Sequence, residues 1–400
     1  MRKNKLKIIF FCASLALMAG GFFWLAQWEK PWQKVENKSV ENKVVNAEKE
    51  KVEIVAEKTA PAFLVAGWIP YWAKSAGVAS LQGKLNLFSQ LNLFAFSVDA
   101  RGELVDTLKL DLAPWPQLLL DAQKEKIKII PTILWGDSVA MHQIFADAGL
   151  REKHADKVVK MLTQYNFTGV DLDYEGKDIA DRDNFSLFLQ TLHEKLKAAP
   201  AKTLSCTIEA RTQDEPPVGF TGVRAMSWAN DFAALNNFCD SITLMAYDQV
   251  FQIQRAKVFE DRSLTLSAPN AENAWVEKNI EYALRFIAPE KLILGVSTYG
   301  WEFRVEKIVE GYRYSRVRSL SYPDAMVLAA SVGAIPTRTT GGELAFTYQA
   351  TGGQYLVTVD DAQTVSDKIT LAKKFKIKGI SLFKLDGLTD PKLFEVLAGK

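Results

Sequence analysis

The sequence predicts an α/β protein whose main domain is a (β/α)8 TIM barrel, and three observations lead to this prediction. From residue 61 onwards, short apolar runs alternate with longer amphipathic stretches, the pattern of repeated strand–helix units in a parallel sheet. Eight such runs occur, which is the number that closes a barrel. The rival fold is a doubly wound open sheet, but no Gly-x-Gly-x-x-Gly motif follows the first run, where the sequence reads AGWIPYW.

The predicted barrel strands are short apolar segments separated by longer stretches. They are Phe63–Ile69, Leu91–Val98, Ile127–Ile133, Gly169–Asp173, Leu204–Ala210, Ser241–Ala246, Leu292–Ser297 and Gly379–Lys384. Intervening stretches such as Ala155–Tyr165, Asp183–Ala198 and Asp361–Phe375 repeat apolar residues at helical spacing. Each strand is therefore expected to adjoin a helix on the outside of the barrel.

The gap between the seventh and eighth strands is too long for a single crossover helix. Within it, Ala345–Gln349 and Gln354–Val359 flank a Thr-Gly-Gly turn and predict a β-hairpin. Residues 322–332 predict a helix. Together they predict a small α+β insertion, about residues 300–362, at the mouth of the barrel.

Residues 1–27 are predicted to form a membrane anchor. Four of the first seven residues are Lys or Arg, and the uncharged run Ile8–Ala26 that follows is 19 residues long, enough to cross a membrane as a helix. Because positive flanks remain cytoplasmic, we expect a single-pass protein in the cell membrane with its barrel on the extracytoplasmic side. A cleaved signal peptide, which would leave a secreted protein, is the alternative.

Residues 28–60 are predicted to form a charged, flexible stalk, and residues 61–400 the barrel. The stalk is rich in Lys, Glu, Asn and Val, and contains no glycine. Such mixed charge with few aromatic residues cannot bury much surface. A short coiled coil is the alternative, but the near-repeat VENK recurs after five residues, which fits a seven-residue period poorly.

Whole-chain composition excludes several classes of protein. The 49 Lys and Arg against 47 Asp and Glu leave a net charge of +2, with 48% hydrophobic and 24% charged residues. These values exclude a disordered chain, a collagen-like repeat and a polytopic membrane protein, and they give no support for nucleic-acid binding. The three histidines have no zinc-binding spacing, so we expect no metal or other cofactor. We also expect the protein to be a monomer.

Two cysteines, Cys206 and Cys239, fall on or just before neighbouring predicted strands. A disulfide between them is conceivable in an oxidising compartment. Two buried free thiols are an equally weighted alternative.

Three acids alternate along the fourth predicted strand, which reads FTGVDLDYE at residues 167–175. Since alternate residues of a strand share a face, Asp171, Asp173 and Glu175 are expected to point into the barrel together. Their mutual repulsion and burial would raise at least one pKa, which suits a general acid. Glu175 is nearest the mouth and is the natural proton donor. An exposed edge strand or a divalent-cation site are the alternatives.

This segment resembles the Asp-Gly-x-Asp-x-Asp-x-Glu signature of glycoside hydrolase family 18, the chitinase family. Thr168 replaces the first Asp of that signature, and we expect this change to affect tuning or stability more than chemistry. The resemblance extends over about residues 63–400. LFAFS at 93–97, MAYD at 245–248 and LGVSTYG at 294–300 look like the second, sixth and seventh strands of the family.

The resemblance implies a retaining hydrolysis in which the substrate's own 2-acetamido oxygen replaces an enzyme nucleophile. Glu175 would protonate the glycosidic oxygen and later activate water. Asp173 would orient and stabilise the acetamido group, and the Tyr247 hydroxyl would hold its carbonyl oxygen. Asp171 would share charge or a proton with Asp173.

Further residues near the ends of the predicted strands are expected to bind the sugar. They are Trp68, Tyr71, Ser97, Glu209, Arg211, Asp248, Tyr299 and Phe383. Relatives carry a tryptophan where this chain has Phe383, whose smaller ring stacks with less area and indicates a divergent branch. Trp72 and Trp135 are further candidates for lining the cleft, with buried packing the alternative for each.

The resemblance implies a substrate of β-1,4-linked N-acetylglucosamine, peptidoglycan first and chitin second. The short connections and the segment LSYPDA at 320–325 look more like the bacterial spore-cortex and germination branch than the long-grooved chitinases. A catalytically weak or inactive lectin-like protein is the alternative, for which Phe383 is the main support. A metal-dependent hydrolase is a third hypothesis, but no histidine lies near the three acids.

Overall fold

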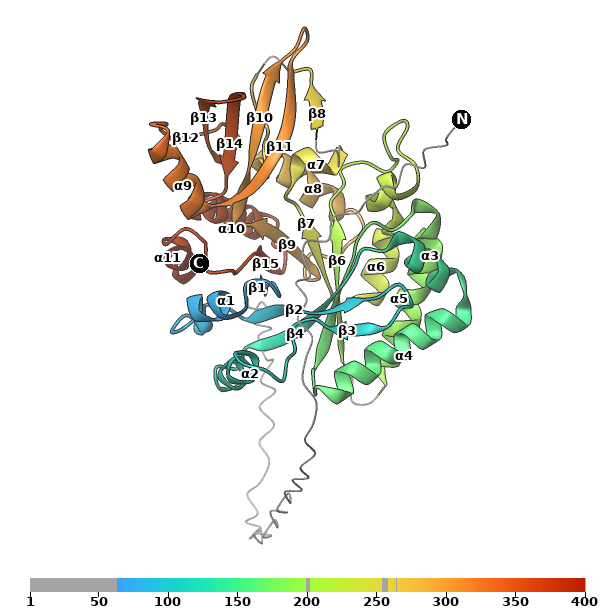
Figure 1. Ribbon diagram of the computed structural model, residues 1–400. Coiled ribbons are helices and arrows are strands. Elements are labelled where there is room, and N and C mark those ends of the chain that lie inside the picture. Colours follow the sequence, from blue (N-terminus) through green and yellow to red (C-terminus); the bar gives the residue numbers. More distant parts are fainter. Residues whose placement is uncertain (1–62, 199–201, 254–257, 264, 400) are drawn as a thin grey trace, which may run out of the picture. The chain divides into compact units, whose positions relative to one another are not determined.

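The computed structural model describes four segments, which are residues 63–198, 202–253, 258–263 and 265–399 (Figure 1). All four belong to one compact unit, Ala60–Lys400. The predicted anchor and stalk, residues 1–27 and 28–60, lie outside the described residues. Within the described part of the chain, no helix has both the length and the apolar character needed to cross a membrane.

Eight parallel strands close into a barrel, and each corresponds to a predicted strand. In hydrogen-bonded order they are β1 (Leu64–Ile69), β15 (Gly379–Phe383), β9 (Leu292–Ser297), β7 (Ser241–Met245), β6 (Thr203–Glu209), β5 (Gly169–Tyr174), β4 (Lys128–Trp135) and β2 (Gln90–Val98). Pairing of β1 with β2 closes the ring. A short strand, β3 (Leu104–Asp106), extends it antiparallel to β2. The predicted (β/α)8 barrel is confirmed.

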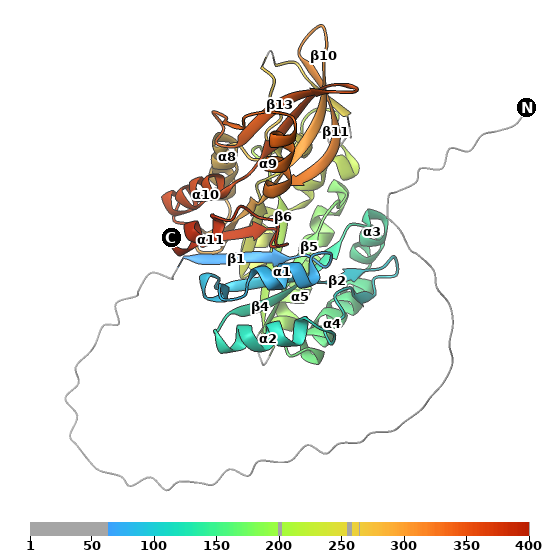
Figure 2. The same cartoon turned by 60° about the vertical axis from the view of Figure 1, so that its left-hand side comes forward.

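Helices pack around the barrel strands (Figures 1 and 2). They are α1 (Lys74–Ser80), α2 (Trp115–Lys124), α3 (Ser138–Ala146), α4 (Ala148–Gln164), α5 (Arg182–Lys197), α6 (Phe232–Phe238), α8 (Asn273–Ala283), α10 (Ala362–Lys374) and α11 (Leu393–Ala398). The short helix α7 (Gln249–Ile253) lies instead at the mouth of the barrel, where Phe251 packs against Phe303. In α5 the buried residues recur every three or four positions and form one apolar stripe. That stripe is Phe185, Phe188, Leu189, Leu192 and Leu196.

A second, antiparallel sheet is formed by the insertion, which begins where β9 ends, together with β8 (Val258–Asp261) from the connection between β7 and β9. Its strands, in hydrogen-bonded order, are β12 (Thr337–Arg338), β13 (Leu344–Ala350), β14 (Gly353–Val359), β10 (Tyr299–Lys307), β11 (Tyr312–Ser321) and β8. The predicted hairpin is β13–β14, and the predicted helix is α9 (Tyr322–Ser331). The long hairpin β10–β11 and strand β8 were not predicted. Strand β10 alternates apolar and polar residues from Trp301 to Glu306, a signal that the sequence analysis did not use, whereas the alternation in β11 changes phase at Ser315–Arg316 and β8 is only four residues long.

A β-bulge in β11 changes which side chains lie on each face of the strand. On one side of the bulge Glu302 pairs with Arg318, and on the other side Phe303 pairs with Arg316. Directly paired residues of an antiparallel sheet share a face, while successive residues alternate. Arg316 therefore lies on the face of Phe303, and Arg318 lies on the opposite face with Glu302. In a regular strand two arginines separated by one residue would share a face.

The barrel contains a disulfide between Cys206 of β6 and Cys239, two residues before β7. Their Cα atoms are 6.1 Å apart. Of the two alternatives for these cysteines, the structure has the disulfide. The bridge joins β6 to the segment that leads into β7, and both of these strands contribute residues to the pocket described next.

Candidate active site

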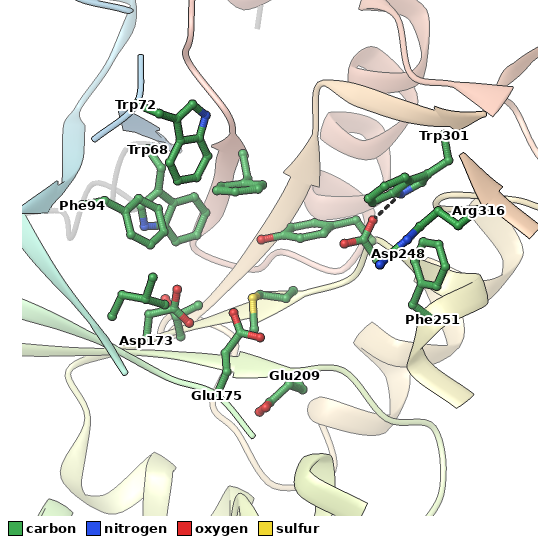
Figure 3. A pocket seen from close by; sticks show the side chains of 15 residues that line it. Trp68, Trp72, Phe94, Asp173, Glu175, Glu209, Asp248, Phe251, Trp301 and Arg316 are labelled. Atoms are coloured by element: carbon green, nitrogen blue, oxygen red, sulfur yellow. Dashed lines mark hydrogen bonds between the residues drawn. The ribbon is translucent and has the colours of Figure 1, made fainter. Parts of the chain in front are cut away.

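A pocket of about 420 Å3 lies at the C-terminal ends of the barrel strands, where the insertion begins (Figure 3). Barrel active sites occupy this end, because the loops that follow the strands converge there. Fifteen residues line the pocket. They are Trp68, Trp72, Phe94, Leu134, Asp173, Glu175, Thr207, Glu209, Met245, Tyr247, Asp248, Phe251, Trp301, Arg316 and Phe383.

Strand β5 brings the three predicted acids together. Asp171 and Asp173 lie on its inner face, and Glu175 follows the last residue of the strand. The backbone N–H of Glu175 donates to the Trp135 carbonyl at 2.8 Å, which extends the pairing of β5 with β4 to the pocket rim. On the outer face, Tyr174 packs against α4 and α5. The strand's alternation thus points the acids inward, as predicted.

Asp171 lies beneath the pocket and is fully buried. Its carboxylate accepts hydrogen bonds from Thr132 Oγ1 at 2.9 Å, Thr207 Oγ1 at 3.0 Å and Trp68 Nε1 at 3.4 Å. Burial raises the pKa of Asp171, and these hydrogen bonds oppose that rise. Asp171 therefore supports its neighbour from below without lining the pocket.

Asp173 forms the floor of the pocket and is 3% exposed. Burial raises its pKa well above the usual value, and the nearby charges of Glu175, Asp171 and Glu209 add to the rise. Its Oδ1 atom is buried and accepts no hydrogen bond from any residue the structure describes. An atom in this position suits a ligand N–H, since a buried acceptor without a donor is costly.

Glu175 and Glu209 line the same side of the pocket (Figure 3). Glu175 is half-buried. Glu209 is nearly fully buried and accepts hydrogen bonds from the Gly176 N–H at 3.2 Å and from Asn230 Nδ2 at 2.7 Å. The buried Lys177 ammonium lies 3.9 Å from it. Glu209 therefore braces the loop that carries Glu175, a role the sequence did not reveal.

Tyr247 and Phe383 form an aromatic pair in the pocket. Their rings stack with centroids 5.7 Å apart and planes 9° from parallel. Trp68 meets Phe383 edge-on at 6.1 Å. Burial and the charges of Asp173 and Glu175 raise the pKa of Tyr247, so its hydroxyl stays protonated and can donate a hydrogen bond.

Asp248 is held rigidly on the insertion side of the pocket. Its Oδ1 accepts a hydrogen bond from Trp301 Nε1 at 2.8 Å (Figure 3) and another from Tyr299 Oη at 2.9 Å. Its backbone has φ 55°, in the left-handed region, and its N–H donates to Asn270 Oδ1 at 3.1 Å. Asn270, itself fully buried, thus fixes an unusual backbone conformation at the pocket edge.

Several residues predicted to bind the sugar lie outside the pocket lining. Ser97 accepts a hydrogen bond from Thr107, and Tyr71 is exposed with its ring edge-on to Trp72. Arg211 donates to the Ser227 carbonyl and lies 4.2 Å from the ring centroid of Phe232. Tyr299 stands behind Asp248.

Trp135 is likewise buried behind β5, where its ring meets Tyr174 edge-on.

Seven lining residues were not among the predicted site residues: Phe94, Leu134, Thr207, Met245, Phe251, Trp301 and Arg316. Trp301 had a weak signal, because it lies two residues beyond Tyr299 and shares its face of β10. Phe251 and Arg316 had none, since α7 and β11 were not predicted. Trp72 lines the pocket as proposed.

The sequence matches the family described as glycosyl hydrolases family 18 over residues 67–387. The uncharacterized glycosylase YvbX of Bacillus subtilis (strain 168) is 22% identical over 352 residues, covering 83% of this chain and 94% of that protein. The cortical fragment-lytic enzyme of Bacillus anthracis is 24% identical over 257 residues, which cover 64% of this chain and 54% of that enzyme. The aligned region thus spans about half of that relative's length.

Among solved structures, the chitinase from Chromobacterium violaceum ATCC 12472 superimposes with a TM-score of 0.70 at 22% identity, covering 84% of this chain and 98% of that one. The family match spans the barrel, the insertion and all the acids of the pocket. The chain therefore belongs to glycosyl hydrolases family 18 and is a glycoside hydrolase.

Proposed function

We propose that the protein hydrolyses β-1,4-linked N-acetylglucosamine polysaccharide, peptidoglycan before chitin, by a retaining and substrate-assisted mechanism. One observation carries this proposal. The buried Asp173, whose Oδ1 accepts no hydrogen bond from a described residue, shares a pocket with the half-buried Glu175 and the Tyr247 hydroxyl. This is the set of groups that an attacking acetamido group requires: an acceptor for its N–H, a donor for its carbonyl oxygen and an acid for the leaving group.

In the proposed reaction, Glu175 transfers its proton to the glycosidic oxygen as the bond to the anomeric carbon breaks. The acetamido oxygen of the same sugar attacks that carbon and forms an oxazolinium ion, whose N–H is held by Asp173. Water then attacks the anomeric carbon while Glu175 takes its proton, which restores the acid. Two displacements at one carbon give overall retention.

The names of the relatives support the choice of substrate. One relative is a cortical fragment-lytic enzyme and one structural neighbour is a chitinase. Aromatic rings on two sides of the pocket provide stacking surfaces for sugar rings.

The experiment incubates the full chain, in mild detergent, with purified peptidoglycan and with N-acetylglucosamine oligomers, followed by mass analysis of the products. We expect new reducing ends on N-acetylglucosamine, and for Glu175→Gln a loss of turnover of about 10²-fold or more with folding and binding retained. Normal hydrolysis by Glu175→Gln would falsify the assigned role of this residue.

We also propose that the enzyme is tethered to the cell membrane with its barrel on the extracytoplasmic side. The uncharged run of 19 residues behind a basic tip supports this, and so does the Cys206–Cys239 disulfide, since disulfides persist in oxidising compartments. Two charges placed in the run, Leu15→Arg with Leu17→Arg, should release the protein from the membrane fraction. If the wild type is found in the soluble fraction, the tether is wrong.

A lectin-like protein is the second candidate, and Phe383 favours it. Its phenyl ring offers less stacking area than the tryptophan expected there, so a bound sugar would be held less firmly in a reactive conformation. Binding of chito-oligosaccharides without any product from either polymer would select this alternative.

A further inference from the structure

Arg316 lies beside the bulge in β11 and lines the pocket. The register shift beyond Glu302 sets Arg316 opposite Phe303, on the face of β10 that also carries Trp301. The neighbouring Arg318 lies on the other face and forms an ion pair with Glu302 at 2.5 Å. One extra residue in the strand thus separates a cation that lines the pocket from one that supports the sheet.

The guanidinium of Arg316 rests on two aromatic rings of the pocket wall. Its Cζ lies 5.0 Å from the ring centroid of Phe251 and 5.3 Å from that of Trp301 (Figure 3). Contacts of this kind hold the cation in place without using its N–H donors.

The charge of Arg316 is not paired within the described part of the protein. No hydrogen bond or ion pair joins its guanidinium to another residue that the structure describes. By contrast, Arg313 of the same strand pairs with Glu260 and Glu306, and Arg318 pairs with Glu302. The pocket-facing arginine of β11 is therefore the one with N–H donors available for a ligand.

The charge balance of the pocket indicates what kind of ligand this is. Its fifteen lining residues include four carboxylates, of Asp173, Glu175, Glu209 and Asp248, and one cation, Arg316. A neutral N-acetylglucosamine chain carries no anionic group that could pair with the cation. A glycan that carries carboxylates would be repelled by the four acids. Arg316 would offset this repulsion, because the N–H donors of a guanidinium match the geometry of a carboxylate.

Resting on the proposed hydrolase function, we propose that Arg316 binds a carboxylate on a substituent of the sugar chain and so selects an anionic N-acetylglucosamine glycan over a neutral one. In peptidoglycan this chemistry is present in the lactyl ether of muramic acid and in the stem peptide. Chitin has neither group. Arg316 would affect which glycan is preferred, and it would not alter the groups of β5 that break the glycosidic bond.

The test compares two substrates that differ only in charge, using the full chain in mild detergent. One is peptide-free glycan strands with free lactyl carboxylates, and the other is the same strands with those carboxylates converted to methylamides. The ratio of kcat/KM for the two is measured for wild type, for Arg316→Gln and for Arg316→Lys. Arg304→Gln is the matched control, because Arg304 is an exposed arginine on the opposite face of β10.

We expect wild type to prefer the anionic strands by roughly tenfold, the effect of one charge-assisted hydrogen bond. Arg316→Gln should bring the ratio close to one, and Arg316→Lys should retain part of it, while Arg304→Gln should keep the wild-type ratio. The preference should also weaken as salt is raised. Equal cleavage of both strands by wild type, or an equal loss on both strands in Arg316→Gln, overturns the proposal.

Binding measured by calorimetry in the Glu175→Gln background separates this proposal from the hydrolase function. If no substrate is cleaved by wild type, the proposed function fails, but a charge preference in binding that depends on Arg316 still supports the site. Peptide-bearing strands identify the source of the carboxylate, because their lactyl group is an amide and only the stem peptide carries free carboxylates. If wild type prefers these strands to the methylamide strands, the stem peptide supplies the carboxylate. If it does not, the lactyl group supplies it.

Discussion

The pocket has two walls of different origin. The barrel wall carries Asp173, Glu175 and Tyr247 at the ends of parallel strands, where burial and mutual charge raise pKa values. The insertion wall carries Trp301 and Arg316 on an antiparallel hairpin. The first wall is fixed by the closed ring of hydrogen bonds, and the second by the register of the β10–β11 hairpin within the six-stranded sheet. Under the proposed function, bond breaking would belong to the barrel wall and ligand selection to the insertion wall.

Replacement of Asp173 by Asn should produce the largest effect and is confined to the barrel wall. The amide keeps the shape but lacks the negative charge that stabilises an oxazolinium ion, so kcat should fall by about 10²- to 10³-fold with KM little changed. Initial rates on N-acetylglucosamine oligomers measure this. A kcat within threefold of wild type would mean that Asp173 is structural.

The scaffold behind the barrel wall is cross-linked, and removing the cross-link should cost stability before activity. Cys206 and Cys239 are 33 residues apart in sequence, so loop-closure entropy predicts a loss of about 4 kcal/mol in the free energy of unfolding for the double Ser variant. Urea denaturation of oxidised wild type and of the variant measures the difference. Equal midpoints would show that the bridge adds nothing to stability.

The scaffold behind the insertion wall is polar and should respond to pH. Burial, aided by the charge of Asp360, raises the pKa of Glu343 from 4.5 to about 8. Between these values the folded protein holds a proton that the unfolded chain has released, so stability falls as the pH rises from about 4.5 through 8.

Glu343→Gln cannot ionise and should lose less stability than wild type between pH 5 and pH 8. The difference is on the order of 3 kcal/mol. Denaturant titrations at both pH values measure it, and Glu310→Gln, at an exposed position in the insertion, is the control. Parallel pH profiles for Glu343→Gln and wild type would contradict the assignment.

Trp301→Ala should show the smallest effect and the clearest contrast between the walls. It removes a stacking surface and one hydrogen bond to Asp248, so KM should rise about tenfold while kcat changes less than threefold. Trp68→Ala on the barrel wall should instead lower stability by about 3 to 5 kcal/mol, because Trp68 is fully buried. If Trp301→Ala lowered kcat and left KM unchanged, the division between the walls would be wrong.

The barrel wall could be predicted from sequence because its physics is local. Alternation along β5 was enough to bring Asp171, Asp173 and Glu175 to one face, and eight apolar runs were enough to predict the barrel. Ser97 was expected to bind sugar because it lies at a strand end. Its hydroxyl instead accepts a hydrogen bond from Thr107, which follows the unpredicted strand β3.

The insertion wall could not be predicted, because it depends on contacts between distant segments. Phe251 lies on the five-residue helix α7, which is too short to give a periodic signal, and Arg316 lies on a strand whose register is broken by a bulge. Similarly, Arg211 was expected to bind the sugar. Its guanidinium instead packs on Phe232, a partner 21 residues further along the chain.

The bulge in β11 also bears on how such enzymes diverge. Deleting the single residue Val317 would make Arg316 and Arg318 successive residues of a regular strand, opposite Phe303 and Glu302, so each arginine would stay on its present face. The extra residue is therefore not needed to aim Arg316 at the pocket. It allows a third side chain to be inserted between the two arginines while every barrel strand keeps its register.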